Sequence, residues 1–183
     1  MRFTELALKG VLLVDPERHE DERGFFARTW CRREFEARGV AGSPVQCSVS
    51  QNTLRGTLRG LHYQGPPHGE AKLVRCTSGA IFDVVVDLRP DSATFLQHVS
   101  IVLSRDNHQA IYVPEYCAHG FLTLENDTEV FYQMSSYYEP AAARGIRWND
   151  PRLAIAWPNA VAVISERDRT YPDLHPENKG PAR

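Results

Sequence analysis

The sequence lacks paired cysteines, long apolar runs and any strong excess of one charge. Its four cysteines, Cys31, Cys47, Cys76 and Cys117, are widely scattered with no CxxC spacing, which favours free thiols over disulfides or a zinc knuckle. No apolar window approaches the length of a membrane span, and the start of the chain lacks the apolar run of a secretion signal. We therefore expect a cytoplasmic protein that has no membrane partner.

The charge balance gives no sign of a nucleic-acid surface. The formal net charge is -2, and 42% of the 183 residues are hydrophobic while 24% are charged, as in an ordinary soluble domain with a substantial core. We therefore expect no nucleic-acid partner, although local basic clusters could still hold a phosphorylated small molecule.

What the sequence does contain is a series of short apolar or alternating runs, separated by turn-forming Gly, Pro, Asn and Asp. The runs that predict strands are 10–14, 24–30, 45–50, 57–63, 72–76, 80–88, 99–103, 109–113, 120–124 and 129–134. So many short strands predict an all-β sandwich or barrel. A short helix is expected at 32–38, and one further helical turn at 140–145.

The chain shows no internal repeat, linker or compositional break before residue 175. We therefore expect a single domain at residues 1–174. Residues 175–183 are rich in Pro, Glu, Asn, Lys and Gly, which predicts a loose C-terminal tail.

Two histidines stand out by their position. His62 lies near the end of the predicted strand 57–63, and His119 follows Pro114 by five residues, just before the predicted strand 120–124. This spacing, with an asparagine beyond it, is that of the second cupin motif. In a jelly roll, both histidines could face the interior of the barrel.

A metal site is the first alternative for two such histidines, because cupins often hold iron, manganese or zinc with a His-x-His pair, a glutamate and a later histidine. In this chain Gln64 stands where the second histidine would, and His68 and Glu70 lie in a Pro- and Gly-rich turn. We therefore expect no metal and no cofactor. Without a metal, His119 could be a buried, hydrogen-bonded histidine that only supports the barrel.

Seven short motifs follow one another along the chain between about Asp21 and Leu174. They are Arg23-Gly24-Phe25-Phe26, Leu58-Arg59-Gly60-Leu61-His62-Tyr63-Gln64, Lys72-Leu73-Val74, Asp83-Val84-Val85-Val86-Asp87-Leu88-Arg89, Ala118-His119-Gly120-Phe121, Trp148-Asn149-Asp150-Pro151 and Ser165-Glu166-Arg167-Asp168. Each is weak alone, but together and in this order they resemble the dTDP-4-dehydrorhamnose 3,5-epimerase family. The resemblance implies a metal-free, cofactor-free cupin jelly-roll barrel that forms a homodimer and epimerises a nucleotide-linked 4-keto-6-deoxyhexose.

The resemblance also implies four catalytic residues. His62 would be the base that removes a proton beside the ketone, with Asp168 fixing the imidazole and stabilising its cation. Tyr132 would return a proton from the opposite face, and Lys72 would place positive charge beside the developing enolate oxygen. Without the resemblance, Asp168 could equally be a surface loop residue, Tyr132 a strand residue with an exposed hydroxyl, and Lys72 a solvated lysine.

Phosphate-binding residues are implied in the same way. Arg59 and Arg23 would bind the diphosphate, because guanidinium groups match phosphate oxygens. Arg23 would reach in from the partner subunit together with Phe25. The alternative for both arginines is ordinary ion pairing at the surface.

The remaining implied contacts concern the base and the sugar. Gln46 would contact the nucleotide base, and Tyr138 would stack an aromatic ring on it. His119 would sit beside the sugar, and Arg167 is carried over with the motif 165–168.

Three positions depart from the pattern of the rhamnose-pathway members. Arg28 and Ala143 stand where those members have glutamate, and Ser48 stands where they have asparagine. All three concern nucleotide recognition, so the carrier could be dTDP, CDP or another nucleotide. Inversion at carbon 3, carbon 5 or both also stays open, as do the final sugar and its pathway.

Two alternative functions remain on the sequence alone. One is a metal-dependent cupin isomerase or dioxygenase. The other is a sugar-binding cupin without catalytic activity.

Overall fold

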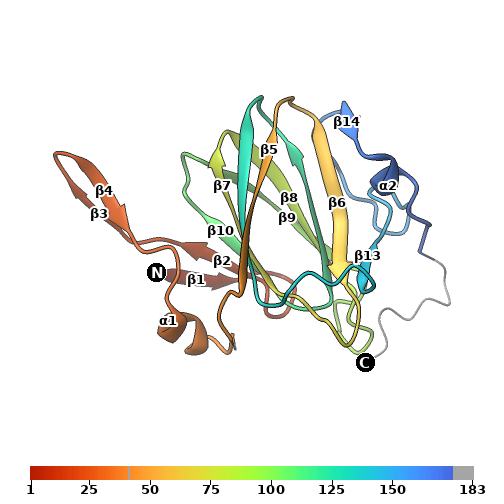
Figure 1. The fold of residues 1–183 in the computed structure, drawn as a ribbon, viewed down its shortest axis with the longest axis horizontal. Helices are drawn as coiled ribbons and strands as arrows, with labels where there is room; N and C mark the ends of the chain where they lie inside the picture. The colour runs from red at the N-terminus through yellow and green to blue at the C-terminus, as the bar shows by residue number, and fades with distance from the viewer. Residues whose placement is uncertain (41, 175–183) are drawn as a thin grey trace.

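In a computed structural model of the chain, two antiparallel sheets pack face to face and enclose a barrel (Figure 1). The structure describes residues 1–40 and 42–174. The first sheet has the strand order β1 (Arg2–Glu5), β2 (Leu12–Asp15), β10 (Ala110–Val113), β7 (Lys72–Ser78), β12 (Thr128–Met134) and β5 (Gln46–Asn52). The second has the order β13 (Ala143–Gly145), β6 (Thr57–Gln64), β11 (Cys117–Thr123), β8 (Ala80–Asp87) and β9 (His98–Ser104).

Several smaller elements lie outside the two main sheets. Strand β14 (Val163–Ile164) pairs parallel with β6 and leads into the short helix α2 (Glu166–Arg169). Strands β3 (Arg18–Asp21) and β4 (Gly24–Ala27) form a separate two-stranded hairpin that projects away from the barrel (Figure 1). Helix α1 (Arg32–Glu36) follows the hairpin and packs Phe35 against the first sheet.

The ten strands predicted from the sequence are all present, with boundaries shifted by a few residues at most. Two expectations need correction. The segment 140–145 is a turn followed by strand β13, because Ala143–Gly145 pairs with the end of β6. Strand β11 begins at Cys117, so His119 lies within the strand and not before it. The expected tail at 175–183 lies outside the described residues.

The core lies between the two sheets and continues behind the second one. Strand β8 is buried on both faces: Ile81 and Val85 point between the sheets, while Val84 and Val86 pack under the C-terminal segment. Because side chains alternate along a strand, Asp83 shares the inner face with Ile81 and Val85. A carboxylate is thereby placed in an otherwise apolar interior.

The same alternation puts polar groups at one end of the barrel interior. On β7, Lys72 occupies the same face as the core residues Val74 and Cys76, and on β12, Tyr132 occupies the same face as Val130. The apolar core therefore gives way to polar side chains towards one end. Within residues 1–40 and 42–174, no helix has the length and apolar character needed to cross a membrane.

Candidate active site

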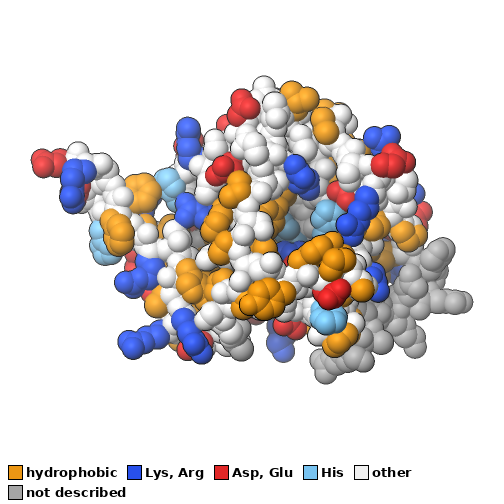
Figure 2. Space-filling model, in the orientation of Figure 1, with side chains coloured by type: hydrophobic (Ala, Val, Ile, Leu, Met, Phe, Trp, Pro, Cys, Tyr) orange, Lys and Arg blue, Asp and Glu red, His pale blue; other side chains and the backbone are white. Residues whose placement is uncertain are grey.

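A cavity of about 560 Å³ opens at this polar end, between the two sheets and beside α2. Figure 2 shows the hollow, with histidine and Lys or Arg side chains around it. The lining includes Ser50, Thr57, Leu58, Arg59, His62, Lys72, His119, Tyr132, Ser165, Arg167 and Asp168. An adjoining cavity of about 280 Å³ shares His62, Lys72, Tyr132 and Arg167 and adds Ser48, Gln64, Glu70 and Tyr138. Seven of the residues expected to form a site thus meet around one cleft, and Tyr138 lies in its extension.

His62 and Asp168 form a direct pair at the edge of the cleft. Nε2 of His62 lies 2.7 Å from Oδ1 of Asp168, and the backbone N–H of Gly60 donates to the other carboxylate oxygen at 3.1 Å. Asp168 is only 4% exposed, so it is not the surface loop residue that the sequence left as an alternative.

Local structure explains why Asp168 arrives there. Val163 and Ile164 pair in parallel with Thr57 and Leu58 of β6, which brings the start of α2 alongside the strand that carries His62. Ser165 caps the helix by accepting the backbone N–H of Asp168 at 3.1 Å. The cap fixes the position of the residue that contacts the imidazole.

The pair also sets which imidazole nitrogen is free. Burial alone would raise the pKa of Asp168, but hydrogen bonds from His62 and Gly60 outweigh it and hold that pKa below its ordinary value. The ionised carboxylate can only accept, so Nε2 of His62 carries the proton and donates. Nδ1 is therefore left as the nitrogen that can accept a proton from a ligand in the cleft.

A second histidine–carboxylate pair lies deeper. His119 stands directly opposite His62 across β6 and β11, and its Nε2 lies 2.8 Å from Oδ2 of Asp83. Both side chains are buried, and Oδ1 of Asp83 has no hydrogen-bond partner among the described residues. His119 is thus a buried, hydrogen-bonded histidine, as one reading of the sequence expected, and it also lines the cavity.

Lys72 and Tyr132 complete the polar end. Nζ of Lys72 lies 3.3 Å from Oε1 of Glu70 and 3.4 Å from the backbone oxygen of His62, with only 13% of its side chain exposed. Burial lowers the pKa of Lys72. Burial, followed by the charge of Asp83, raises the pKa of Tyr132 and keeps its phenol protonated. Neither residue is the solvated or surface side chain that the sequence alone allowed.

The side chains expected to act as base and acid come from opposite sheets. His62 projects from β6 in the second sheet, whereas Tyr132 projects from β12 in the first, and both line the same cavity. The ring of Tyr132 meets the ring of His119 edge-on, at a centroid distance of 6.0 Å. A flat ligand between the sheets would therefore present one face to an imidazole and the other to a phenol.

Cationic and aromatic groups lie around the cleft. Nε of Arg59 donates to the side-chain oxygen of Asn52 at 2.7 Å, and Arg59 lines the main cavity. The guanidinium of Arg167 lies 5.8 Å from the centre of the Tyr171 ring. The backbone N–H of Tyr138 donates to the side-chain oxygen of Gln46 at 2.6 Å, so these two residues are held together at the cleft's outer end.

Among the described residues, Gln46 lines neither cavity although it contacts Tyr138, and two further expected binding residues, Arg23 and Phe25, lie away from the cleft. Arg23 lies on the projecting hairpin with its side chain 84% exposed and paired with Asp21. Phe25 packs on the ring of His108 at 4.7 Å. In the described part of the chain, neither lines either cavity. Of the departures from the family pattern, Arg28 pairs with Glu34 near α1, while Ser48 and Ala143 line the outer cavity.

Sequence reasoning did not assign the partners of two site residues. Asp83 lay within a quoted motif without a role, although a carboxylate on the inner face of β8 was a usable signal. Glu70 was considered only as a metal ligand, and nothing in the sequence indicated its contact with Lys72. Among the residues described, no three His, Cys, Asp or Glu side chains come together to hold a metal ion. All four cysteines, which lie within that part of the chain, are free.

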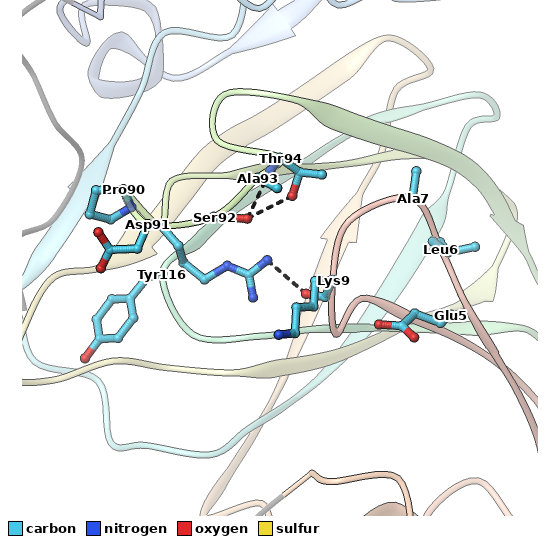
Figure 3. Close-up of a pocket in the computed structure, with 11 residues that line it drawn as sticks. Glu5, Leu6, Ala7, Lys9, Pro90, Asp91, Ser92, Ala93, Thr94 and Tyr116 are labelled. Atoms are coloured by element: carbon cyan, nitrogen blue, oxygen red, sulfur yellow. Dashed lines mark hydrogen bonds between the residues drawn. The ribbon is translucent and has the colours of Figure 1, made fainter.

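A larger hollow of about 730 Å³ lies beside the turn between β1 and β2 (Figure 3). Its main cation, Arg89, is held by Asp87 and also donates to the backbone oxygen of Lys9 at 2.9 Å. Ser92 and Thr94 donate their hydroxyls to the same Asp87 carboxylate. These polar groups bind one another and shape a loop, so the smaller cleft with its two histidine–carboxylate pairs is the better candidate for chemistry.

Known proteins are similar to this chain in sequence over nearly its whole length. The family model described as dTDP-4-dehydrorhamnose 3,5-epimerase matches residues 5–176. A dTDP-4-dehydrorhamnose 3,5-epimerase of Pseudomonas aeruginosa is 44% identical over 171 residues, which cover 92% of this chain and 93% of the relative. That of Escherichia coli is 41% identical over 167 residues, which cover 90% and 89% of the two chains.

Solved structures of members of this family have a similar fold. A dTDP-4-dehydrorhamnose 3,5-epimerase of Bacillus anthracis with TDP and PPi bound has a TM-score of 0.91 at 42% identity, covering 94% of this chain and 99% of that one. A 3'-monoepimerase of Streptomyces bikiniensis in complex with dTDP-quinovose has a TM-score of 0.85 at 34% identity, covering 92% and 85%. These likenesses confirm the expected all-β, cupin-type jelly-roll barrel. The chain therefore belongs to the dTDP-4-dehydrorhamnose 3,5-epimerase family, a family of isomerases.

Proposed function

We propose that this chain epimerises a dTDP-linked 4-keto-6-deoxyhexose by removing a proton beside the ketone and returning one from the opposite face. The observation that carries the proposal is the placement of His62 and Tyr132 on opposite sheets around one cavity. Family membership supports the substrate class, because the relatives are named for dTDP-4-dehydrorhamnose.

In the first step, Nδ1 of His62 takes the proton from the carbon next to the ketone. The electron pair of the broken C–H bond moves into the ketone and produces an enolate. Asp168 stabilises the imidazolium that forms, because its carboxylate accepts the hydrogen bond from Nε2. Lys72 lies in the same cavity and supplies a donor for the enolate oxygen, where fixed charge is most effective in a sheltered site, and the buried His119 lies beside the sugar.

In the second step, the phenol of Tyr132 gives its proton to the carbon from the other side, which inverts that centre. The raised pKa of Tyr132 ensures that the phenol carries this proton at neutral pH. Once the enolate has collapsed to the ketone, proton exchange with solvent restores both side chains.

The carrier nucleotide would occupy the outer part of the cleft. Arg59 and Arg167, which line the cavity, would bind the diphosphate, and Tyr138 with Gln46 would hold the base. We further propose a homodimer in which the hairpin of one protomer delivers Arg23 and Phe25 to its partner. The support is that the hairpin projects from its own barrel with these side chains exposed.

The number of inverted centres remains part of the proposal to be tested. Relatives differ in this respect: the Escherichia coli protein is named a 3,5-epimerase and the Streptomyces bikiniensis protein a 3'-monoepimerase. Because one base and one acid serve either carbon, the sugar's orientation in the pocket decides which carbon reacts.

The test offers the purified protein a panel of dTDP- and CDP-linked 4-keto-6-deoxyhexoses in heavy water. NMR would follow deuterium uptake and product stereochemistry. We expect deuterium at carbon 3, carbon 5 or both with the dTDP sugar, and a loss of about 10²–10⁴-fold in exchange for His62→Asn. The control is His98→Asn, on the outer strand β9, which should keep full activity.

Two results would contradict the proposal. If no 4-keto sugar takes up deuterium but turnover of any sugar requires stoichiometric iron, manganese or zinc by elemental analysis, the protein is a metal-dependent cupin. If the wild type binds dTDP sugars with no exchange, and His62→Asn binds them equally well, it is a sugar-binding protein without catalysis.

A further inference from the structure

We propose that Glu70 is a positioning residue that keeps Lys72 protonated inside the cleft. This inference rests on the proposed function for its catalytic meaning, although the contact itself can be tested without substrate. Glu70 lies just before β7 at the end of a turn, and it takes no part in the proton transfers described above.

The contact is close and sheltered. Oε1 of Glu70 lies 3.3 Å from Nζ of Lys72, and the two side chains are 7% and 13% exposed. Both side chains also line the outer cavity. Pairs at the protein surface contribute little because water screens them, but this pair is largely removed from water, so its charges interact more strongly.

The surroundings of Lys72 make such a partner necessary. Burial lowers the pKa of Lys72, whereas Glu70 raises it and the more distant Asp83 on β8 raises it further. The other ionisable groups that line the same cavities are His62, Tyr63, Tyr132, His119, Tyr138, Arg59, Arg144, Arg167 and Asp168. Glu70 is the carboxylate in direct contact with the ammonium group among the described residues.

A neutral lysine would fail in the proposed reaction. The enolate oxygen gains negative charge as the C–H bond breaks, and a protonated amine stabilises that charge far better than a neutral one. By favouring the charged form of Lys72, Glu70 would extend the pH range over which the enzyme works. It would act through Lys72 and not on the substrate.

The experiment measures the proton on Lys72 directly. The sequence contains three lysines, Lys9, Lys72 and Lys179, so protein labelled with ¹³C-lysine gives a simple NMR titration. The signal of Lys72 is identified by its absence from Lys72→Met. In Glu70→Gln, which keeps the shape but removes the charge, we expect the titration midpoint of Lys72 to fall by about one pH unit or more, a tenfold loss of proton affinity.

Two variants serve as controls. Glu70→Asp keeps a carboxylate, so it should hold the midpoint between those of the wild type and Glu70→Gln. Glu115→Gln removes a charge whose carboxylate lies beside Gly69 in the same part of the fold, and it should leave the midpoint of Lys72 unchanged. Melting temperatures would establish that each variant is folded.

Activity gives the second readout. In Glu70→Gln the high-pH limb of kcat should move down by the same amount as the NMR midpoint, while kcat below that limb changes little. An unchanged Lys72 midpoint would overturn the proposal, and a shifted midpoint with an unmoved kcat limb would overturn its role in the reaction. If the wild type turns over no 4-keto sugar, the proposed function fails while the NMR result still decides the pairing.

Discussion

Nε2 of His62 lies 2.7 Å from Oδ1 of Asp168, although 106 residues separate the two along the chain. The contact joins a barrel strand to a helix of four residues that is held by parallel pairing between β14 and β6. Because the carboxylate is buried and ionised, it fixes the imidazole's tautomer and stabilises the positive charge that the imidazole gains on protonation.

Asp168→Asn tests that contribution. The amide oxygen can still accept a hydrogen bond from Nε2, but it carries no charge to stabilise the imidazolium. We expect kcat for epimerisation to fall by about 10²–10⁴-fold with a small change in KM, measured by NMR of the product. A variant within threefold of the wild type would mean that the pair only orders the barrel.

Tyr132→Phe should separate proton removal from inversion. The base remains, so the substrate should still take up deuterium from heavy water on its original face. Without the phenol, the inverted product should form about 10²–10⁴-fold more slowly. Tyr112→Phe, whose ring packs against Phe35 away from the cleft, is the matched control; inverted product at the normal rate from Tyr132→Phe would assign the acid elsewhere.

Exchange of hairpins between protomers can be tested by mixing two weak variants. Arg23→Ala lacks the hairpin cation, and His62→Asn lacks the base. If Arg23 acts in the partner's cleft, a mixed dimer holds one complete site, so unfolding and refolding an equal mixture should restore activity at about a quarter of all sites. Recovery no better than the sum of the separate variants would place Arg23 in its own protomer's site or outside any site.

The loop beside the larger hollow should make stability depend on pH. Burial alone would raise the pKa of Asp87, but hydrogen bonds from Arg89, Ser92 and Thr94 lower it to about 2, against 3.8 for the free group. A lowered pKa in the folded state means that the carboxylate stabilises the fold above about pH 4 and loses this effect as the pH falls towards 2.

Asp87→Asn should therefore unfold more easily than the wild type at neutral pH, by about 2 kcal/mol. Urea unfolding at neutral and acid pH would measure this gap in the free energy of unfolding between the variant and the wild type, which should narrow as the pH falls. Asp91→Asn, in the same loop but exposed, should show no such gap. A gap that stays constant with pH would mean that the ionised form of Asp87 is not what stabilises the loop.

Much of the fold could be predicted from alternation and turn residues. Runs such as 80–88 carry enough apolar residues to mark a strand in a barrel core. Strands β1 and β3 were missed because their sequences, Arg-Phe-Thr-Glu and Arg-His-Glu-Asp, have almost no apolar alternation. Helix α2 was missed because four polar residues form no amphipathic pattern, and its position depends on pairing with β6.

The site was partly predictable for a related reason. His62, Lys72 and Tyr132 lie within strands that the sequence predicted, and the family resemblance implied their place in the site. The contacts of Asp83 and Glu70 depend on which strands become neighbours and on how the turn at 65–71 folds. Such contacts follow from three-dimensional pairing, which no short stretch of sequence encodes.

The position of α2 after all the barrel strands along the chain fixes the order in which the site is built during synthesis. His62 leaves the ribosome long before Asp168, and every strand from β1 to β13 precedes the helix that carries the carboxylate. A nascent chain can therefore assemble the barrel while its imidazole is still alone. A chain that ended between residues 146 and 165 would contain strands β1 to β13 but would lack the carboxylate that pairs with His62.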